Sequence, residues 1–233
     1  MITLALDAST YVGTVAVLRD GRLLAQGETA MRGRDVERLM PAVAQALESA
    51  GVAVGDVSRV VCGDGPGSFT SLRIAASIAK GIAMGSGAVL MRVSSLALIP
   101  AGAADLAAGP YVAVLDALRG EAYFQRFRRA DSGEVAAESR YYLGPLEAVG
   151  TLAAEHGARV VGPEDVLALV GAAAGGGGLP DGAVAVAPHA RGVAALEDAL
   201  ETADLAGWEP RYGRLAEAQV KWEAEHGRPL PAP

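Results

Sequence analysis

The chain has 233 residues, of which 51% are hydrophobic, and its formal net charge at neutral pH is −7. This length and composition predict a globular protein with one large domain or two small ones. The negative charge disfavours broad attraction to a polyanion such as RNA by this chain alone. The single cysteine, Cys62, excludes an internal disulfide and a multi-cysteine metal site, and we expect it to be buried at a strand end.

Membrane and secretion signals are missing from the sequence. No apolar run reaches the roughly 18 residues of a membrane helix without a charge or turn signal. The N-terminal segment lacks the basic region and cleavage site of a signal peptide. We therefore expect a cytoplasmic location and no membrane partner.

The first half of the chain is predicted to begin with three strands, at 2–7, 13–18 and 22–28. Asp20-Gly21, between the last two, is a strong hairpin turn. A helix at 35–50 follows, because apolar residues recur at helical spacing and Gly51 can end it. The remaining predicted elements of this half are a strand at 58–64, a glycine-rich loop, a second helix, a strand at 88–94 and a helix at 94–104.

The second half repeats the same order. Its predicted elements are strands at 111–117, 121–128 and 135–143, a short helix from Pro145, a strand at 158–162, a helix at 163–174, a strand at 183–187 and a helix at 191–203. The sequence thus predicts an α/β protein with two lobes, each built on a β-β-β-α-β-α-β-α plan. We place the N-terminal lobe at residues 1–103, the C-terminal lobe at 104–225 and a loose, Pro-rich tail at 226–233.

The glycine-rich loop lies in the run GDGPGSFTSLRIAASIAKGIA at 63–83. Gly65, Pro66 and Gly67 permit a tight turn, and Ser68, Thr70 or Ser71 can cap the following helix. An anion could bind at exposed N–H groups there. The sequence nevertheless lacks both the Walker motif and the dinucleotide fingerprint, and Lys80 lies about three turns into the helix. We therefore predict a structural loop.

One face of the second helix consists mostly of small residues: Leu72, Ala75, Ala76, Ala79, Ile82 and Ala83.

 Two interpretations of this face are open. It either packs against the chain's own sheet or lets a helix of another protein approach closely.

The first predicted turn, Asp7-Ala8-Ser9-Thr10, carries three side chains with oxygen atoms, those of Asp7, Ser9 and Thr10. Asp7 is the only carboxylate that is well placed for catalysis. We favour the interpretation that it caps the turn.

The three histidines and the arginine clusters suggest no site of their own. His156, His189 and His226 are far apart, and none has a partner four residues away, so we expect surface positions and no metal site. The clusters Arg126, Arg128 and Arg129, and Arg211 and Arg214, are either solvated faces or an RNA contact.

The run GPGSFTSLRIAASIAKGIA, preceded by VVCGD and followed by RVSSLALI, resembles the signature of the bacterial TsaB family. This family is the accessory subunit of the complex that synthesises threonylcarbamoyladenosine in tRNA. Further matches are ITLALDAST, VLDALRGEAYFQRF and EPRYGR, so the resemblance spans nearly the whole chain in the right order.

The resemblance implies the actin-like ATPase (ASKHA) fold, in which both lobes of active relatives offer a phosphate-binding hairpin. Asp7, Ser9 and Thr10 resemble the first hairpin. After Asp116, the run Ala117-Leu118-Arg119-Gly120-Glu121 has bulky and charged groups where the second hairpin needs glycine and hydroxyls. The nucleotide cleft is therefore expected to be degenerate, and we expect no cofactor bound tightly by this chain alone.

The resemblance also implies partners. They are a catalytic threonylcarbamoyltransferase subunit (TsaD-like), an ATPase subunit (TsaE-like) and a second copy of this chain, with tRNA reached through the complex. ATP and a metal would be used by the partner subunits. The expected partner interface lies on the two helices of the first lobe, at Leu39, Val43, Leu72, Ala75, Ala76, Ala79, Ile82 and Ala83.

The sequence departs from the family pattern at two places. Arg34-Asp35-Val36-Glu37 stands where the family commonly has His-Ser-Glu, and Ser71 stands where glycine is common.

The alternative function is a small-molecule phosphotransferase of the same superfamily, which would need a second phosphate loop and a base. A protease is unsupported, because no Ser–His or metal pair is evident.

Overall fold

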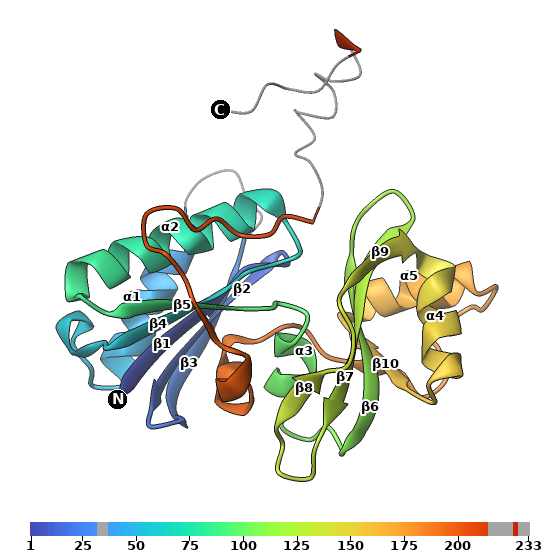
Figure 1. Ribbon diagram of the computed structural model, residues 1–233, viewed down its shortest axis with the longest axis horizontal. Helices are drawn as coiled ribbons and strands as arrows, with labels where there is room; N and C mark the ends of the chain where they lie inside the picture. Colours follow the sequence, from blue (N-terminus) through green and yellow to red (C-terminus); the bar gives the residue numbers. More distant parts are fainter. Residues whose placement is uncertain (32–36, 214–225, 228–233) are drawn as a thin grey trace.

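The computed structural model describes residues 1–31, 37–213 and 226–227, and it consists of two α/β lobes side by side (Figure 1). Helices α1 and α2 cover the outer face of the first sheet, and α4 and α5 cover the outer face of the second. Helix α3 lies between the two sheets. The molecule is thus layered as helix, sheet, helix, sheet and helix.

The five strands predicted for the first lobe form, and a sixth strand from the C-terminal segment, β12, completes its sheet in the order β12-β5-β4-β1-β2-β3. Strand β1 pairs antiparallel with β2 and parallel with β4, so the carboxyl ends of β1, β4 and β5 meet at one edge. The elements in chain order are β1 (Ile2–Asp7), β2 (Val12–Arg19), β3 (Arg22–Ala30), α1 (Leu39–Ser49), η1 (Val54–Asp56), β4 (Arg59–Gly63), α2 (Phe69–Ser86), β5 (Val89–Val93) and α3 (Leu98–Gly102).

The second lobe repeats this order, with its sheet arranged as β11-β10-β6-β7-β8 and with β9 also paired to β7. The predicted two-lobe α/β fold is therefore confirmed, and the third predicted strand of this lobe is divided into β8 and β9. The elements in chain order are β6 (Gly109–Asp116), β7 (Glu121–Arg129), β8 (Val135–Ala137), β9 (Tyr142–Pro145), α4 (Leu146–Glu155), β10 (Arg159–Gly162), α5 (Glu164–Ala173), β11 (Val184–Ala185), η2 (Ala190–Ala195), η3 (Glu197–Ala199) and β12 (Glu201–Thr202).

A single apolar core joins the lobes. It contains Ala5 and Val61 from the first sheet, Ala113 and Phe127 from the second, and Leu98 of α3, all at most 1% exposed. Burial of this much apolar surface between the sheets favours a fixed arrangement of the two lobes.

The segment after β11 departs from the prediction. The helix predicted at 191–203 is wrong, because residues 190–199 form the short 3₁₀ helices η2 and η3 and β12 then pairs antiparallel with β5 of the first sheet. A Cβ on Gly192 would lie 2.7 Å from the Gly102 nitrogen, so this glycine allows η2 to pack closely on α3. Without β12, strand β5 would leave an open edge on the first sheet. Residues 201–202 pair with this edge through ladder hydrogen bonds, which explains why the segment is extended.

Helix α1 begins at Leu39, whereas the sequence predicts a start at residue 35. The Glu37 carboxylate accepts hydrogen bonds from the backbone N–H groups of Leu39 and Met40, which caps the first turn. Residues 34–36 of the altered family motif lie outside the described residues. So do residues 214–225 at the end of the predicted C-terminal lobe, which include Arg214, and positions 228–233 of the predicted loose tail.

Candidate functional site

The turn after β1 is built around the Asp7 carboxylate, which is fully buried. Oδ2 accepts hydrogen bonds from the Ser9 N–H at 3.0 Å and the Ser9 hydroxyl at 2.7 Å, while Oδ1 accepts one from the Ser95 hydroxyl at 2.6 Å. Burial raises the pKa of Asp7, and these hydrogen bonds oppose that rise. Asp7 therefore caps the turn, as predicted, and its carboxylate is enclosed by the protein's own donors. Thr10 completes the turn through its hydroxyl, which accepts from the Val12 N–H at 3.1 Å.

The glycine-rich loop packs directly on this turn. The Ser68 N–H donates to the Ser9 carbonyl at 2.8 Å, and the Gly65 N–H donates to the Ser95 hydroxyl at 3.1 Å. A Cβ on Gly67 would lie 2.8 Å from the Ser9 Cα and closer still to its carbonyl oxygen. Gly65 has a φ of +84°, and its Cβ would overlap the carbonyl group of Arg211. Both glycines are thus required for the close approach of neighbouring backbone.

Helix capping by the loop is different from the prediction. Ser68 is the N-cap residue of α2, but its side chain makes no capping hydrogen bond and lies 3.0 Å from the Ser71 hydroxyl. Thr70 is exposed in the first helical turn. The predicted side-chain cap is therefore wrong for Ser68, because its hydroxyl pairs with Ser71 instead.

The corresponding turn of the second lobe, between β6 and β7, has an unusual backbone. Leu118 and Arg119 have φ values of 62° and 58°, a left-handed conformation that is uncommon for residues other than glycine. The Asp116 carboxylate accepts from the Leu118 N–H at 2.7 Å, and the Leu118 side chain is 49% exposed. The carboxylate at the end of β6 thus caps the turn that follows it, as Asp7 does in the first lobe.

A second buried carboxylate, Asp64, anchors the C-terminal segment to the loop. Its Oδ1 accepts from the Trp208 indole N–H at 3.1 Å, and its Oδ2 accepts from Arg211 Nε at 2.6 Å and from Arg92 at 3.1 Å. The Asp64 backbone carbonyl also accepts from the Arg211 N–H at 2.7 Å. Asp64 is only 1% exposed, so these donors neutralise a carboxylate that would be costly to bury alone.

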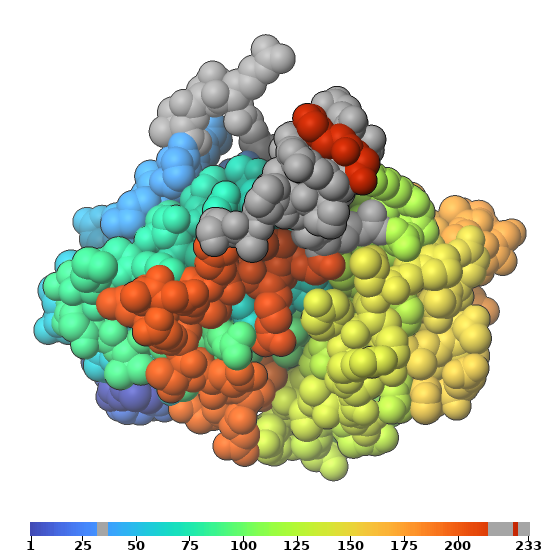
Figure 2. Space-filling model, turned by 45° about the horizontal axis from the view of Figure 1, so that its top comes forward, coloured from blue at the N-terminus to red at the C-terminus, as the bar shows by residue number. Residues whose placement is uncertain are grey.

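Residues 203–213 form a strap, the C-terminal segment that runs along α2 and reaches the second lobe (Figures 1 and 2). Lys80 of α2 lies 5.9 Å from the centre of the Trp208 ring, and the rings of Phe69 and Tyr212 are 4.3 Å apart. At the far end, the Tyr123 hydroxyl of β7 donates to the Tyr212 carbonyl at 3.3 Å. The strap therefore connects the glycine-rich loop with both lobes. Sequence reasoning missed this role of Asp64, although the residue lies in the run VVCGD.

The predicted partner surface is buried within this chain. All eight residues are at most 7% exposed, and all but Leu72 belong to the core beneath α1 and α2: Leu39, Val43, Leu72, Ala75, Ala76, Ala79, Ile82 and Ala83. The assignment of these residues to a partner interface is therefore corrected. A helix that covers a sheet must bury one face, and the sheet takes the face with Leu72 and Ala79.

The opposite face of α2 is the exposed one. Ser77, Gly81 and Gly85 are exposed, Met84 is 71% exposed, and Ile78 is half-buried beside them. A Cβ added to Gly81 or Gly85 would meet nothing within 4 Å. This outward stripe is uncharged and mostly small, which permits close approach by another helix.

Cys62 and two of the three histidines lie where they are expected, whereas His189 does not. Cys62 is buried in β4, as expected, and burial raises the pKa of its thiol. His156 and His226 are exposed, but His189 is 4% exposed, so its predicted surface position is wrong. The His189 Nδ1 atom accepts from the Arg191 N–H at 3.0 Å and caps η2, and burial lowers the pKa of His189 to about 4. This histidine is therefore neutral at pH 7.

No group of three or more histidine, cysteine, aspartate or glutamate side chains among the described residues could hold a metal ion. None of the helices in the described ranges combines the length and apolar character needed to cross a membrane.

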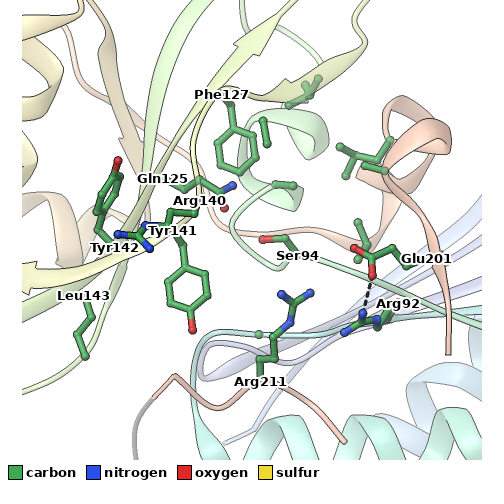
Figure 3. A pocket seen from close by; sticks show the side chains of 17 residues that line it. Arg92, Ser94, Gln125, Phe127, Arg140, Tyr141, Tyr142, Leu143, Glu201 and Arg211 are labelled. Carbon is green, nitrogen blue, oxygen red and sulfur yellow. Dashed lines mark hydrogen bonds and ion pairs between the residues drawn. The ribbon is translucent and has the colours of Figure 1, made fainter. Parts of the chain in front are cut away.

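A cavity of about 700 Å³ lies between the lobes, beside the strap (Figure 3). The first lobe and the strap contribute the ends of β5 and β12 and Arg211, while the second lobe contributes β7, β8 and the segment before β9. Its polar lining includes Arg92, Ser94, Gln125, Arg140, Tyr141, Glu201 and Arg211. Three arginines and one glutamate thus line this cavity.

Comparisons with known proteins agree with this architecture. The family model described as "TsaD: tRNA N6-adenosine threonylcarbamoyltransferase" matches residues 31–155, more than half of the chain. In structure, the chain is similar to an uncharacterized Pseudomonas aeruginosa protein "with similarity to peptidase YEAZ", with a TM-score of 0.76 and 28% identity over 91% of this chain and 99% of that one.

Several relatives carry the name "tRNA threonylcarbamoyladenosine biosynthesis protein TsaB", including those of Escherichia coli and Bacillus subtilis. The Escherichia coli protein is 34% identical over 57% of this chain and 58% of its own length. The Bacillus subtilis protein is 30% identical over 95% of this chain and 98% of its own length. Because this second match covers both proteins almost completely, the chain belongs to the TsaB family.

Proposed function

We propose that this chain is a non-catalytic subunit required for threonylcarbamoyladenosine modification of tRNA in the cytoplasm. It serves the catalytic threonylcarbamoyltransferase subunit as a scaffold, together with an ATPase subunit, and tRNA is reached through the complex. Membership of the TsaB family supports this role, since the relatives are named for this biosynthesis.

The outward stripe of α2, consisting of Ser77, Ile78, Gly81, Met84 and Gly85, is the observation that carries the proposal. Exposed apolar side chains such as Met84, beside glycines with open space above them, are typical of a close helix–helix contact. In place of the buried face, we therefore assign the partner interface to this stripe. The same surface would join two copies of this chain when the transferase subunit is absent.

Replacement of Gly81 by arginine tests this interface. We expect Gly81→Arg to weaken binding to the co-expressed transferase subunit at least about 100-fold, because a long charged side chain would be buried without a partner. The monomer should remain folded, because a Cβ at Gly81 meets no atom within 4 Å. Co-elution in size-exclusion chromatography and the level of modified tRNA are the measurements.

Gly150→Arg is the matched control for this experiment. Gly150 lies in α4 of the second lobe, and a Cβ there also meets no atom within 4 Å. This variant should bind the transferase normally and should support modification. Normal co-elution of the Gly81 variant would contradict the assignment of the interface to α2.

We further propose that the chain alone neither binds ATP tightly nor hydrolyses it. Both carboxylate oxygens of Asp7 accept hydrogen bonds from Ser9 and Ser95, and the N–H groups of Gly65 and Ser68 already donate within the protein. These groups are the ones that a phosphate or its metal ion would need. Calorimetry should therefore detect no tight binding, and a low-micromolar dissociation constant for ATP would favour the alternative, a phosphotransferase.

A further inference from the structure

Arg211 projects from the strap into the cavity between the lobes, with part of its binding capacity unused. Its Nε donates to Asp64 at 2.6 Å, which fixes the base of the guanidinium. Its two terminal nitrogens bind no other described residue, and they point into the cavity (Figure 3). By contrast, Arg92 is engaged at both terminal nitrogens, by Asp64 at 3.1 Å and by Glu201 at 2.5 Å. The two terminal nitrogens of Arg211 therefore form a fork of N–H donors that Asp64 holds in place and that has no partner among the described residues.

Further donors face this fork from both lobes. The hydroxyl of Ser94, at the end of β5, points into the cavity and has no partner among the described residues (Figure 3). Tyr141 lines the facing wall in the second lobe, and its hydroxyl likewise has no hydrogen bond within the described part of the chain. The cavity is also partly apolar, since Phe127, Val135 and Leu196 line it.

We propose that this cavity binds a small organic oxyanion, a phosphate monoester or a carboxylate, that carries an apolar or planar part. The fork of Arg211 takes two oxygens of the anion, because a guanidinium held at Nε matches such groups bidentately. Ser94 and Tyr141 donate to the remaining oxygens, and the apolar wall receives the rest of the ligand. Since the anion touches both lobes and the strap, its binding would strengthen their connection.

Equilibrium dialysis of the full chain at constant ionic strength tests this site. The probes are phenyl phosphate, a phosphate monoester on a planar ring; phenylacetate, a carboxylate joined to a planar ring by one methylene; and inorganic phosphate, which lacks an apolar part. We expect saturable binding of one molecule per chain for phenyl phosphate or phenylacetate, and weaker binding of inorganic phosphate. A preference for phenyl phosphate identifies a phosphate ligand, and a preference for phenylacetate identifies a carboxylate.

Two serine variants make the test specific to the cavity. Ser94→Ala should weaken probe binding about tenfold, because it removes a hydrogen bond to a charged group. Ser58→Ala is the control, since the exposed Ser58 hydroxyl donates to the Ile2 carbonyl at 3.0 Å and is not part of the cavity lining. Absence of saturable binding for all three probes, or equal losses in the two variants, would overturn the proposal. The measurement uses the isolated chain, so its result is independent of the proposed scaffold function.

Discussion

The free energy of unfolding should fall by about 3 kcal/mol when Asp64 is replaced by alanine. The variant leaves the indole N–H of Trp208 buried without an acceptor, and it removes the carboxylate that Arg92 and Arg211 share. The Arg211 side chain is 51% exposed, so that ion pair contributes the smaller part of the loss. Chemical denaturation followed by tryptophan fluorescence gives the change in stability.

The same variant should loosen the strap before the rest of the molecule. The Arg211 N–H, which donates to the Asp64 carbonyl at 2.7 Å, should exchange with solvent faster, whereas amides in β1 should change only with global stability. Glu201→Ala is the control, because it removes the exposed carboxylate of the same network. The Glu201 side chain is 59% exposed, so its loss should lower the free energy of unfolding by less than about 1 kcal/mol. Equal losses in the two variants would contradict the central role of Asp64.

Gly67→Ala should destabilise the protein by more than about 3 kcal/mol and should reduce complex formation and tRNA modification together. Its added Cβ would lie 2.8 Å from the Ser9 Cα and closer to the carbonyl oxygen, which is backbone and cannot rotate away. Relief of this overlap requires the loop to move, and the loop sets the start of α2, the helix that carries the proposed interface. Thermal denaturation, co-elution with the transferase and modified-tRNA levels are the three measurements.

Gly87→Ala is the matched control at the other end of α2. Gly87 has a φ of +73°, but a Cβ there meets no atom within 4 Å, so the variant should cost only about 1 kcal/mol of backbone strain. It should assemble normally. If Gly67→Ala proved as mild as Gly87→Ala, the loop would tolerate a side chain and would not be the rigid support of α2. An inactive Gly67 variant that assembles normally would instead indicate a chemical role for the loop.

Features set by local chemistry could be predicted from the sequence. The alternation of apolar residues in β1 and β2, the Asp20-Gly21 turn and the helical spacing from Leu39 to Leu47 specify their elements without reference to distant residues. The turn cap at Asp7 depends on Ser9, two residues away, for two of its hydrogen bonds. The glycine-rich loop is likewise evident from the sequence, because positive φ angles and close backbone approach restrict a position to glycine.

Orientation of α2 was decided only by the tertiary structure. Small residues occur on both faces of this helix, Ala79 on one and Gly81 on the other, so the sequence left open which face met the sheet. The structure buries the face with Leu72 and Ala79 because it offers more apolar surface to the sheet, and the proposed interface moves to the opposite side.

By itself, then, the sequence determined the first hairpin of each lobe and the glycine-rich loop of the first lobe, and it indicated the TsaB family through the runs that these segments form. Only the tertiary structure brought Arg211 to Asp64 across 147 positions, paired β12 with β5 and buried His189 against the first lobe. Such contacts depend on how the whole chain closes over a shared core, and no local propensity or spacing encodes them. The strap and the cavity beside it exist for this reason only in the folded chain.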